Sequence, residues 1–329
     1  MKNLFTRSVV AVSLAFSFTL PAFGADSFPS RPVRILVNTA PGGLTDIVTR
    51  LVAQQMAEQL KQTVMVENRP GGDGLIGIRA VKSAPADGYT LLASAGTIAL
   101  QMAMRPDAGY DLAKDFTGIG FMGRSPFLMV TASGSSDATL ADFLARAKKN
   151  PGQLTYASAG VGTVPHIAAA RLLQQAGVNV LHVPYKGNGA AMPDVLGGRV
   201  DMILEAYGSS QGAIKSGQLK ALGVTSSTRT PPLPDVPTIA EQGLPGYSAY
   251  TWLNLAAPAG TPKDVVQRLS EAARAAIKSK PVTERLESNG MEAIDMSTDE
   301  LNKFYADEVE QAKKYVNELG LLNGPKEKQ

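Results

Sequence analysis

The feature that most constrains the fold is a strand, a glycine-rich loop and an amphipathic helix that follow one another directly. The strand is Val33–Val37, and apolar residues then recur at helical spacing from Ile47 to Leu60. Between them, Gly42 and Gly43 let a ligand approach the backbone without interference from a Cβ atom. The loop leads into a helix N-terminus, where free N–H groups and the helix dipole favour a small anion. This stretch therefore predicts an anion site.

A second loop of the same kind lies in the other half of the chain. The loop Ser158–Thr163 follows a short strand over 154–157 and precedes a helix over 165–176. It offers two hydroxyl groups and several N–H donors, whereas an ordinary helix cap would use Thr163 alone. We therefore favour ligand binding here. Its two glycines also resemble the start of a dinucleotide fingerprint, but Pro165 replaces the final glycine, so that signal is weak.

Length and composition limit the class of protein. With 329 residues the chain is long enough for two domains, and its net charge of +3 comes without a basic cluster that would indicate a nucleic-acid partner. The absence of cysteine excludes thiol catalysis and thiolate metal sites. The two histidines, His166 and His182, are too few for most zinc sites. We expect no metal and no cofactor.

Residues 1–25 have the pattern of a secretory signal peptide. Two basic residues precede an apolar run from Val9 to Leu20, and the small residues Ala22 and Gly24 suit a cleavage site. The alternative is a membrane anchor, but the apolar run is short for a bilayer span. We expect export followed by cleavage.

Strand-like and helical segments alternate along the rest of the chain, which predicts an α/β fold with mostly parallel sheets flanked by helices. After residue 116 the pattern changes, because two short strands over 119–122 and 127–130, separated by a turn, precede a second alternating series. We expect two lobes, the first formed by 26–122 plus 227–329 and the second, inserted, by 123–226. Two chain crossings allow a hinge, with a ligand cleft between the lobes.

Several side chains are candidates for ligand contact, and each has a structural alternative. Asp46 and Arg50 lie four residues apart on one helix, where an ion pair is the simplest interpretation. His166 can face the cleft or pack in the core, and His182, in an apolar strand, is more typical of a core residue. Glu205 ends a strand at the edge where parallel sheets present side chains to ligands, although it can also pair with a lysine.

Catalytic motifs are missing from the sequence. It contains no Gly-x-Ser-x-Gly elbow, no Walker lysine loop and no His-Glu-x-x-His motif. A serine triad would need His166 or His182, and neither has an evident acid partner. The absence of these motifs is evidence against catalysis.

Six ordered motifs span essentially the whole chain after the first 25 residues: Phe28–Val37, Pro41–Asp46, Val66–Gly72, Ala84–Leu92, His182–Gly187 and Leu233–Thr238. Together they resemble the motifs of one family, the Bug or tripartite tricarboxylate transporter (TctC-type) periplasmic solute receptors. The resemblance implies a type II-like, two-lobed Venus flytrap in the periplasm that captures a small carboxylate-bearing solute and hands it to a separate membrane permease. It implies a monomer without enzymatic activity. Two alternatives stay open: an exported enzyme that acts on a carboxylate substrate in the cleft between the lobes, and a sensor that delivers its closed form to a membrane signalling partner.

The resemblance also places the carboxylate grip on the two glycine loops. The predicted ligand-binding residues are Ala40, Pro41, Gly42, Gly43, Leu44, Thr45, Asp46, Ser94, Ser158, Ala159, Gly160, Gly162, Thr163, His166 and Glu205. The position of Glu205 frequently carries Asp in the family, and the extra methylene affects the distal pocket. An ionised Glu205 would disfavour a second carboxylate nearby and favour an amine or hydroxyl. Tricarboxylates, dicarboxylates, acidic amino acids, nicotinate and aromatic acids all remain candidate solutes.

Overall fold

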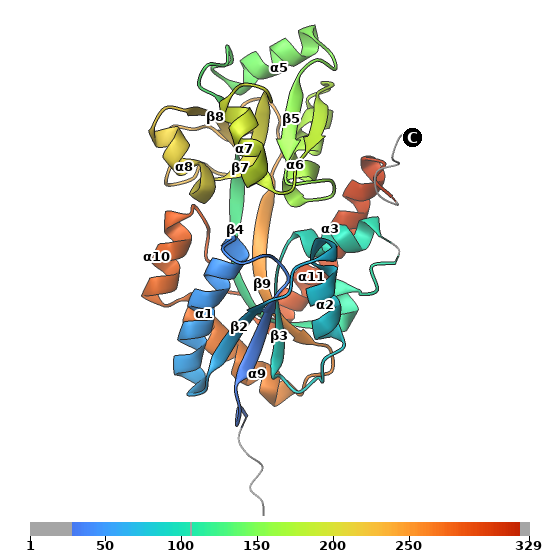
Figure 1. The fold of residues 1–329 in the computed structure, drawn as a ribbon, viewed down its shortest axis with the longest axis vertical. Helices are drawn as coiled ribbons and strands as arrows, with labels where there is room; N and C mark the ends of the chain where they lie inside the picture. The colour runs from blue at the N-terminus through green and yellow to red at the C-terminus, as the bar shows by residue number, and fades with distance from the viewer. Residues whose placement is uncertain (1–27, 106, 323–329) are drawn as a thin grey trace, which may run out of the picture.

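The computed structural model describes residues 28–105 and 107–322, so the expected signal peptide lies outside the described residues. None of the helices in these two ranges combines the length and the apolar character needed to cross a bilayer. The described chain forms two groups of strands, one above the other along the long axis of the molecule, and two long strands run between them (Figure 1).

The first sheet combines parallel and antiparallel pairs. Its strands are β1 (Val33–Val37), β2 (Val64–Asn68), β3 (Thr90–Ala95), β9 (Tyr250–Pro258) and the first part of β4 (Phe116–Ala132). β1 pairs in parallel with β2 and β3, whereas β9 is antiparallel to both β3 and β4.

The second sheet is built in the same way around the last part of β4. Its other strands are β5 (Thr155–Ser158), β6 (Leu181–Pro184), β7 (Met202–Ala206) and β8 (Leu219–Val224). β5 is parallel to β6 and β7, and β4 is antiparallel to β7 and β8. The predicted α/β class is confirmed, but both sheets contain more antiparallel pairing than expected, because the strands that join them are antiparallel to their neighbours.

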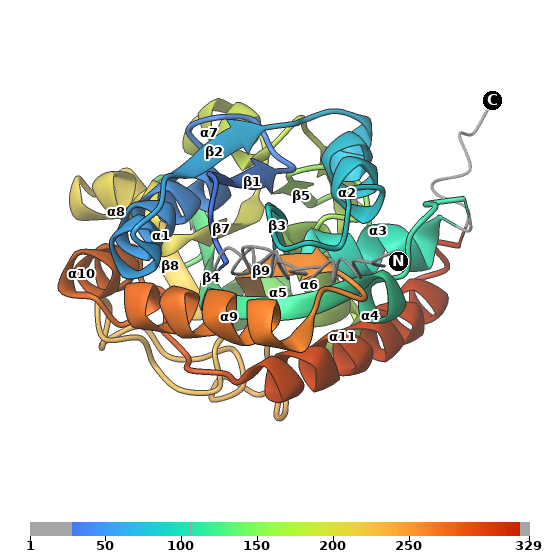
Figure 2. The same ribbon diagram turned by 90° about the horizontal axis from the view of Figure 1, so that it is seen from below.

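Helices cover both faces of each sheet, and Figure 2 shows α1 and α2 on opposite sides of β1 and β3. The helices are α1 (Leu44–Leu60), α2 (Leu75–Lys82), α3 (Thr97–Met104), α4 (Leu112–Asp115), α5 (Leu140–Lys149), α6 (Val164–Gln175), α7 (Asn188–Leu196), α8 (Tyr207–Lys215), α9 (Lys263–Ile277), α10 (Lys280–Ser288) and α11 (Thr298–Glu318), with a short 3₁₀ turn at Gly72–Gly74. Apolar residues from these helices and the strands form a core on each face of each sheet.

β4 corrects one sequence prediction. The segments 119–122 and 127–130 belong to one continuous strand and not to two strands separated by a turn. Glycine and proline in the segment 123–126 predict a turn. Instead, Gly123 takes a positive φ of 132°, and two register shifts against β9 absorb the irregularity. The strand continues through all 17 residues because it is paired along its length, first with β9 and then with β7 and β8.

The pairing of β4 and β9 bears on the expected lobe boundaries. Pro126 still pairs with β9, whereas Phe127 pairs with β7. Part of the segment before β9 packs into the core of the second sheet, through Ile239, Leu244, Tyr247 and Ala249. We therefore propose that the chain crosses between lobes near 126 and near 250, instead of at 122 and 226.

Candidate functional site between the two sheets

The two predicted loops face each other because of the directions of the strands that carry them. β1 is parallel to β3, β3 is antiparallel to β9, and β9 is antiparallel to β4, so β1 and β4 both run toward the second sheet. In the second sheet β4 is antiparallel to β7, and β7 is parallel to β5, so β5 runs back toward the first sheet. The loops after β1 and β5 therefore leave their sheets at facing ends.

Asp46 shapes the first loop from inside. Its carboxylate accepts hydrogen bonds from the Gly42 amide at 2.9 Å, from Arg50 Nε at 3.0 Å and from Asn68 Nδ2 at 2.9 Å. Burial opposes the charge, but these bonds outweigh it and lower the pKa of Asp46. The geometry supports the structural interpretation of the Asp46–Arg50 pair, and the Gly42 amide, one of the predicted donors, is already occupied.

Several backbone amides of the first loop stay open, among them three at the start of α1. Gly43 is the N-cap of α1 and carries no side chain, and the amides of Gly43, Leu44 and Thr45 have no acceptor among the described residues. A Cβ atom built at Gly42 would meet no atom within 4 Å. These three donors, at the positive end of a 17-residue helix, form the anion-binding part of the loop.

The second loop uses its hydroxyl groups internally. Ser158 Oγ accepts from the Gly160 amide at 3.1 Å and lies 2.7 Å from His182 Nε2, and Thr163 Oγ donates to the Gly160 carbonyl at 2.7 Å. Thr163 is the N-cap of α6 by position, but its side chain makes no capping bond. Of the amides in this loop, those of Ala159 and Val161 have no acceptor among the described residues. The hydroxyls therefore hold the loop, and backbone amides are its open donors.

His166 and His182 form a stacked pair beneath this loop, with ring centroids 4.1 Å apart, and Tyr156 extends the stack. The Gly162 amide donates to His166 Nδ1 at 3.1 Å, so this nitrogen carries no proton. Burial, together with the neighbouring His182, lowers the pKa of His166 to about 3, and burial lowers that of His182 to about 4. Both rings are neutral at pH 7, and each makes a hydrogen bond to a residue of the loop.

Glu205 is a buried carboxyl at the end of β7 and is only 5% exposed. Its Oε1 accepts from the Ala206 amide at 2.9 Å and from Ser209 Oγ at 2.5 Å. Burial raises the pKa of Glu205, and this effect outweighs the opposite effect of these bonds and of a further one from Asn188. The sequence left open a pair between Glu205 and a lysine, but no described lysine or arginine pairs with it. The charge of an ionised Glu205 is therefore uncompensated.

Ser94, another predicted contact, is fully buried, and its Oγ donates to Asn254 Oδ1 at 2.7 Å. Asn254 in turn donates to the Tyr305 hydroxyl. This chain of bonds connects β3, β9 and α11 beside the loops. In this arrangement the Ser94 hydroxyl is used to join strands and is not exposed to a ligand.

Gln101 is a residue that sequence reasoning missed. It is 3% exposed on α3, its Oε1 has no partner among the described residues, and with Met104 it lies against Gly162 of the second loop. Thr39 Oγ1, next to the first loop, is likewise buried without a described partner. The sequence does hold one signal for Gln101: it is the polar residue within the apolar run 98–104.

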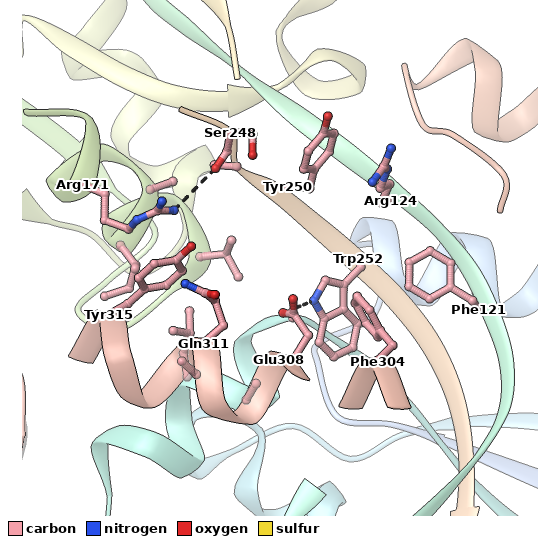
Figure 3. Close-up of a pocket in the computed structure, with 18 of the residues that line it drawn as sticks. Phe121, Arg124, Arg171, Ser248, Tyr250, Trp252, Phe304, Glu308, Gln311 and Tyr315 are labelled. Atoms are coloured by element: carbon pink, nitrogen blue, oxygen red, sulfur yellow. Dashed lines mark hydrogen bonds between the residues drawn. The ribbon is translucent and has the colours of Figure 1, made fainter. Parts of the chain in front are cut away.

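A separate cavity of about 330 Å³ lies between α3, α6, α11 and the joining strands (Figure 3). None of the predicted ligand-binding residues lines it. Its walls are mainly aromatic and apolar, with three charged side chains: Arg124, Arg171 and Glu308. The cavity therefore differs from the predicted grip in both position and chemistry.

Neither metal binding nor acid–base catalysis is supported by the described side chains. They include no group of three or more carboxylate or histidine ligands placed to hold a metal ion. Ser158 and His182 have the spacing of a nucleophile and its base, but Ser158 is fully buried and no described carboxylate bonds the other ring nitrogen.

Two α/β lobes joined by two strands, with amide-lined loops between them, define a periplasmic binding protein fold. The structure of periplasmic binding protein BugD matches it with a TM-score of 0.79 and 33% sequence identity, covering 90% of this chain and 99% of that one. R. palustris Rpa4515 with adipate matches with a TM-score of 0.81 and 31% identity over 89% of this chain and 98% of that one. MatC from Rhodopseudomonas palustris with bound malate matches with a TM-score of 0.78 and 30% identity over 88% and 100%.

The sequence profile of the Tripartite tricarboxylate transporter family receptor (TctC) matches residues 48–321, and the chain belongs to this family. A UPF0065 protein in the tcbD-tcbE intergenic region of Pseudomonas sp. (strain P51) is 37% identical over 325 residues, 98% of this chain and 96% of the relative. These findings confirm the predicted family, the two-lobed class and the expectation of a receptor, since this family is not one of enzymes.

Proposed function

We propose that this receptor captures a small organic carboxylate in the periplasm and delivers it to the membrane permease of a tripartite tricarboxylate-type transporter. The observation that carries the proposal is the pair of facing loops with open amides, at Gly43–Thr45 and at Ala159 and Val161. Neutral N–H donors on two lobes can grip one carboxylate together only when the lobes meet, so binding and closure are linked. The adipate and malate bound by relatives have the same chemistry.

The donor set fits the expected strength of binding. Each charge-assisted hydrogen bond contributes roughly 1.5–3 kcal/mol, and micromolar affinity requires about 8 kcal/mol. Several amides acting together are sufficient, and neither loop contains an arginine. Glu205 lies uncompensated at the end of β7, so we propose that the solute carries a hydroxyl or amino group at its far end.

Calorimetry tests the proposal directly. Protein without residues 1–25, freed of retained solute by unfolding and refolding, is titrated with malate, adipate, citrate, glutamate, nicotinate and benzoate. We expect micromolar binding of at least one acid, and no binding of the corresponding amide. Failure of the refolded protein to bind any of the acids would contradict the proposal.

A proline at Leu44 tests the amide grip itself. Leu44 is the first residue of α1, where proline fits, and Gly43 before it has φ −77° and ψ 167°, which suits a residue preceding proline. Leu44→Pro removes one open N–H, and we expect solute affinity to fall about tenfold or more. Leu44→Ala, the matched control, also shortens the side chain but keeps the amide. Equal affinities for the two variants would exclude the Leu44 amide from the grip.

A further inference from the structure

The cavity of about 330 Å³ beside α11, here called the α11 cavity, is large enough for a small ligand and combines an aromatic wall with one carboxylate. One face of α11 supplies a stripe of side chains at helical spacing: Phe304, Glu308, Gln311 and Tyr315. Trp252 from β9 lies opposite, with its ring 5.2 Å from that of Phe304 (Figure 3). Phe121 and Tyr250 extend the aromatic surface.

Glu308 has no counter-ion in this cavity. Its carboxylate accepts one hydrogen bond, from the Trp252 indole N–H at 2.7 Å. No described lysine or arginine pairs with it, and burial, together with the neighbouring charge of Asp307, raises the pKa of Glu308. Arg171, a cation of the same lining, stacks its guanidinium 3.7 Å over the Tyr315 ring and donates to the Ser248 carbonyl.

We propose that the α11 cavity binds a small amine with an aromatic or apolar body, its ammonium at Glu308 and its body against Trp252 and Phe304. A cation beside a carboxylate and over aromatic faces gains both an ion pair and a cation–π contact in a partly desolvated site. Arg124, the other cation of the lining, is neutralised by Glu292 at 2.8 Å and so does not oppose the ligand charge. This site is separate from the carboxylate grip and does not depend on the proposed function.

The chain contains one tryptophan, so the fluorescence of Trp252 reports on this cavity directly. The probe is 2-phenylethylamine, which has no carboxylate for the grip to bind, and its neutral counterpart is 2-phenylethanol. We expect the amine to change the fluorescence in a saturable way and to bind about tenfold or more tightly than the alcohol. Alcohol binding as tight as that of the amine, or no saturable change with the amine, would overturn the inference.

Two matched variants locate the ammonium site. Glu308→Gln keeps an acceptor for the Trp252 N–H but removes the charge, and we expect it to weaken amine binding about tenfold or more without changing the affinity for the alcohol. Glu310→Gln, on the exposed side of the same helix, should bind the amine as the native chain does. Unchanged amine affinity in Glu308→Gln contradicts the assignment. Should that variant fail to fold, the amine and alcohol titrations of the native chain still decide.

The outcomes also separate this inference from the proposed function. A carboxylate that binds by calorimetry while the amine does not would reject the amine site and leave the receptor function standing. Amine binding without any carboxylate binding would support the amine site and reject the proposed receptor function.

Discussion

His166 and His182 are the residues whose protonation connects most directly to the predicted loop. His166 is buried and His182 is half-buried, both rings are neutral, and His166 Nδ1 accepts a hydrogen bond from the Gly162 amide. A protonated His166 would lose this acceptor role and would face the second ring of the stack at 4.1 Å. Acid is therefore expected to act on the second loop first.

Folding stability should fall as the pH drops from 7 to 5. The unfolded histidine binds a proton near its ordinary pKa of 6.5, whereas folded His166 has a pKa of about 3. The stability that the neutral ring contributes is therefore present above pH 6.5 and is lost as the pH falls toward 3, by about 2 kcal/mol at pH 5 for this residue. Urea unfolding at pH 7 and 5 measures this. His166→Asn retains an acceptor for Gly162 and should reduce the pH dependence, and an unchanged dependence would contradict the assignment.

Glu205 offers a second prediction at the residue scale. Burial raises its pKa above 4.5, so its favourable contribution is present below that value and is lost as the pH rises through the folded pKa. Glu205→Gln should therefore stabilise the solute-free protein at pH 7 relative to the native chain and have no such effect at pH 4. We also expect it to shift solute preference toward acids with a second carboxylate. Calorimetry with malate and citrate checks the preference, and unchanged selectivity would remove Glu205 from the site.

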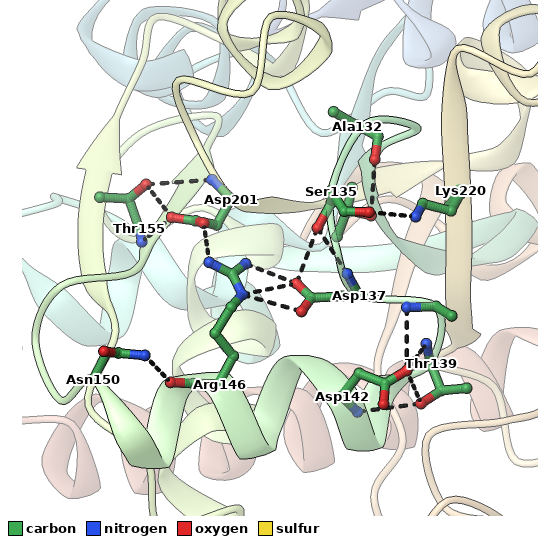
Figure 4. Close-up of polar contacts among 12 residues, drawn as sticks. Ala132, Ser135, Asp137, Thr139, Asp142, Arg146, Asn150, Thr155, Asp201 and Lys220 are labelled. Carbon is green, nitrogen blue, oxygen red and sulfur yellow. Dashed lines mark hydrogen bonds and ion pairs between the residues drawn. The ribbon is translucent and has the colours of Figure 1, made fainter.

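At the scale of elements, one arginine connects several elements at the far end of the second lobe. Arg146 of α5 pairs with Asp137 in the loop before that helix at 2.7 Å and with Asp201 before β7 at 2.8 Å (Figure 4). Asp201 in turn accepts from the Thr155 amide at 2.8 Å, which connects β5 to the same cluster. These bonds join a loop, a helix and two strands that the sequence separates.

Removal of Asp137 should destabilise this lobe. Its side chain is 2% exposed, and Asp137→Ala removes one of the two carboxylates that pair with the partly buried Arg146. We expect a loss of about 2–3 kcal/mol in the free energy of unfolding. Asp307→Ala, which breaks an exposed pair with Lys303 on α11, is the control and should cost no more than about 0.5 kcal/mol. Similar losses for both variants would mean that the Arg146 cluster adds no more stability than a surface pair.

At the scale of the whole molecule, the two lobes touch where Gly162 meets α3. A Cβ atom at Gly162 would lie 1.8 Å from Met104 Cε, so the methionine side chain would have to move to admit one. The residue also has a φ of +75°, which other residues rarely adopt. Both observations favour glycine at this contact between the lobes.

Gly162→Ala should keep the lobes apart and weaken solute binding about tenfold or more, because closure contributes the second half of the grip. Gly177→Ala is the matched control, since Gly177 has a φ of +65° but open space around it. It carries similar backbone strain without the contact. Calorimetry and solution X-ray scattering with and without solute measure binding and closure. Native affinity in Gly162→Ala would show that this contact does not limit closure.

Local patterns predicted most of the elements near the site. The apolar stretch 33–37 and the spacing from Ile47 to Leu60 correspond to β1 and α1, and the apolar segment at 154–157 corresponds to β5. Local patterns fail at β4, where Gly123 and Pro126 predict a turn and the structure has a continuous strand. A strand that joins two sheets is stabilised by partners far away in the sequence, and no local pattern records them.

By itself, the sequence determined the α/β class, the two glycine loops and, through six ordered motifs, the receptor family. These follow from backbone periodicity and from residue types that any fold of this chain must respect. Only the tertiary structure decided which loop donors remain open, because Asp46 takes the Gly42 amide and His166 takes that of Gly162. It also brought Trp252 and Glu308 together across the α11 cavity. The partners of a polar group depend on residues that meet only when the chain has folded.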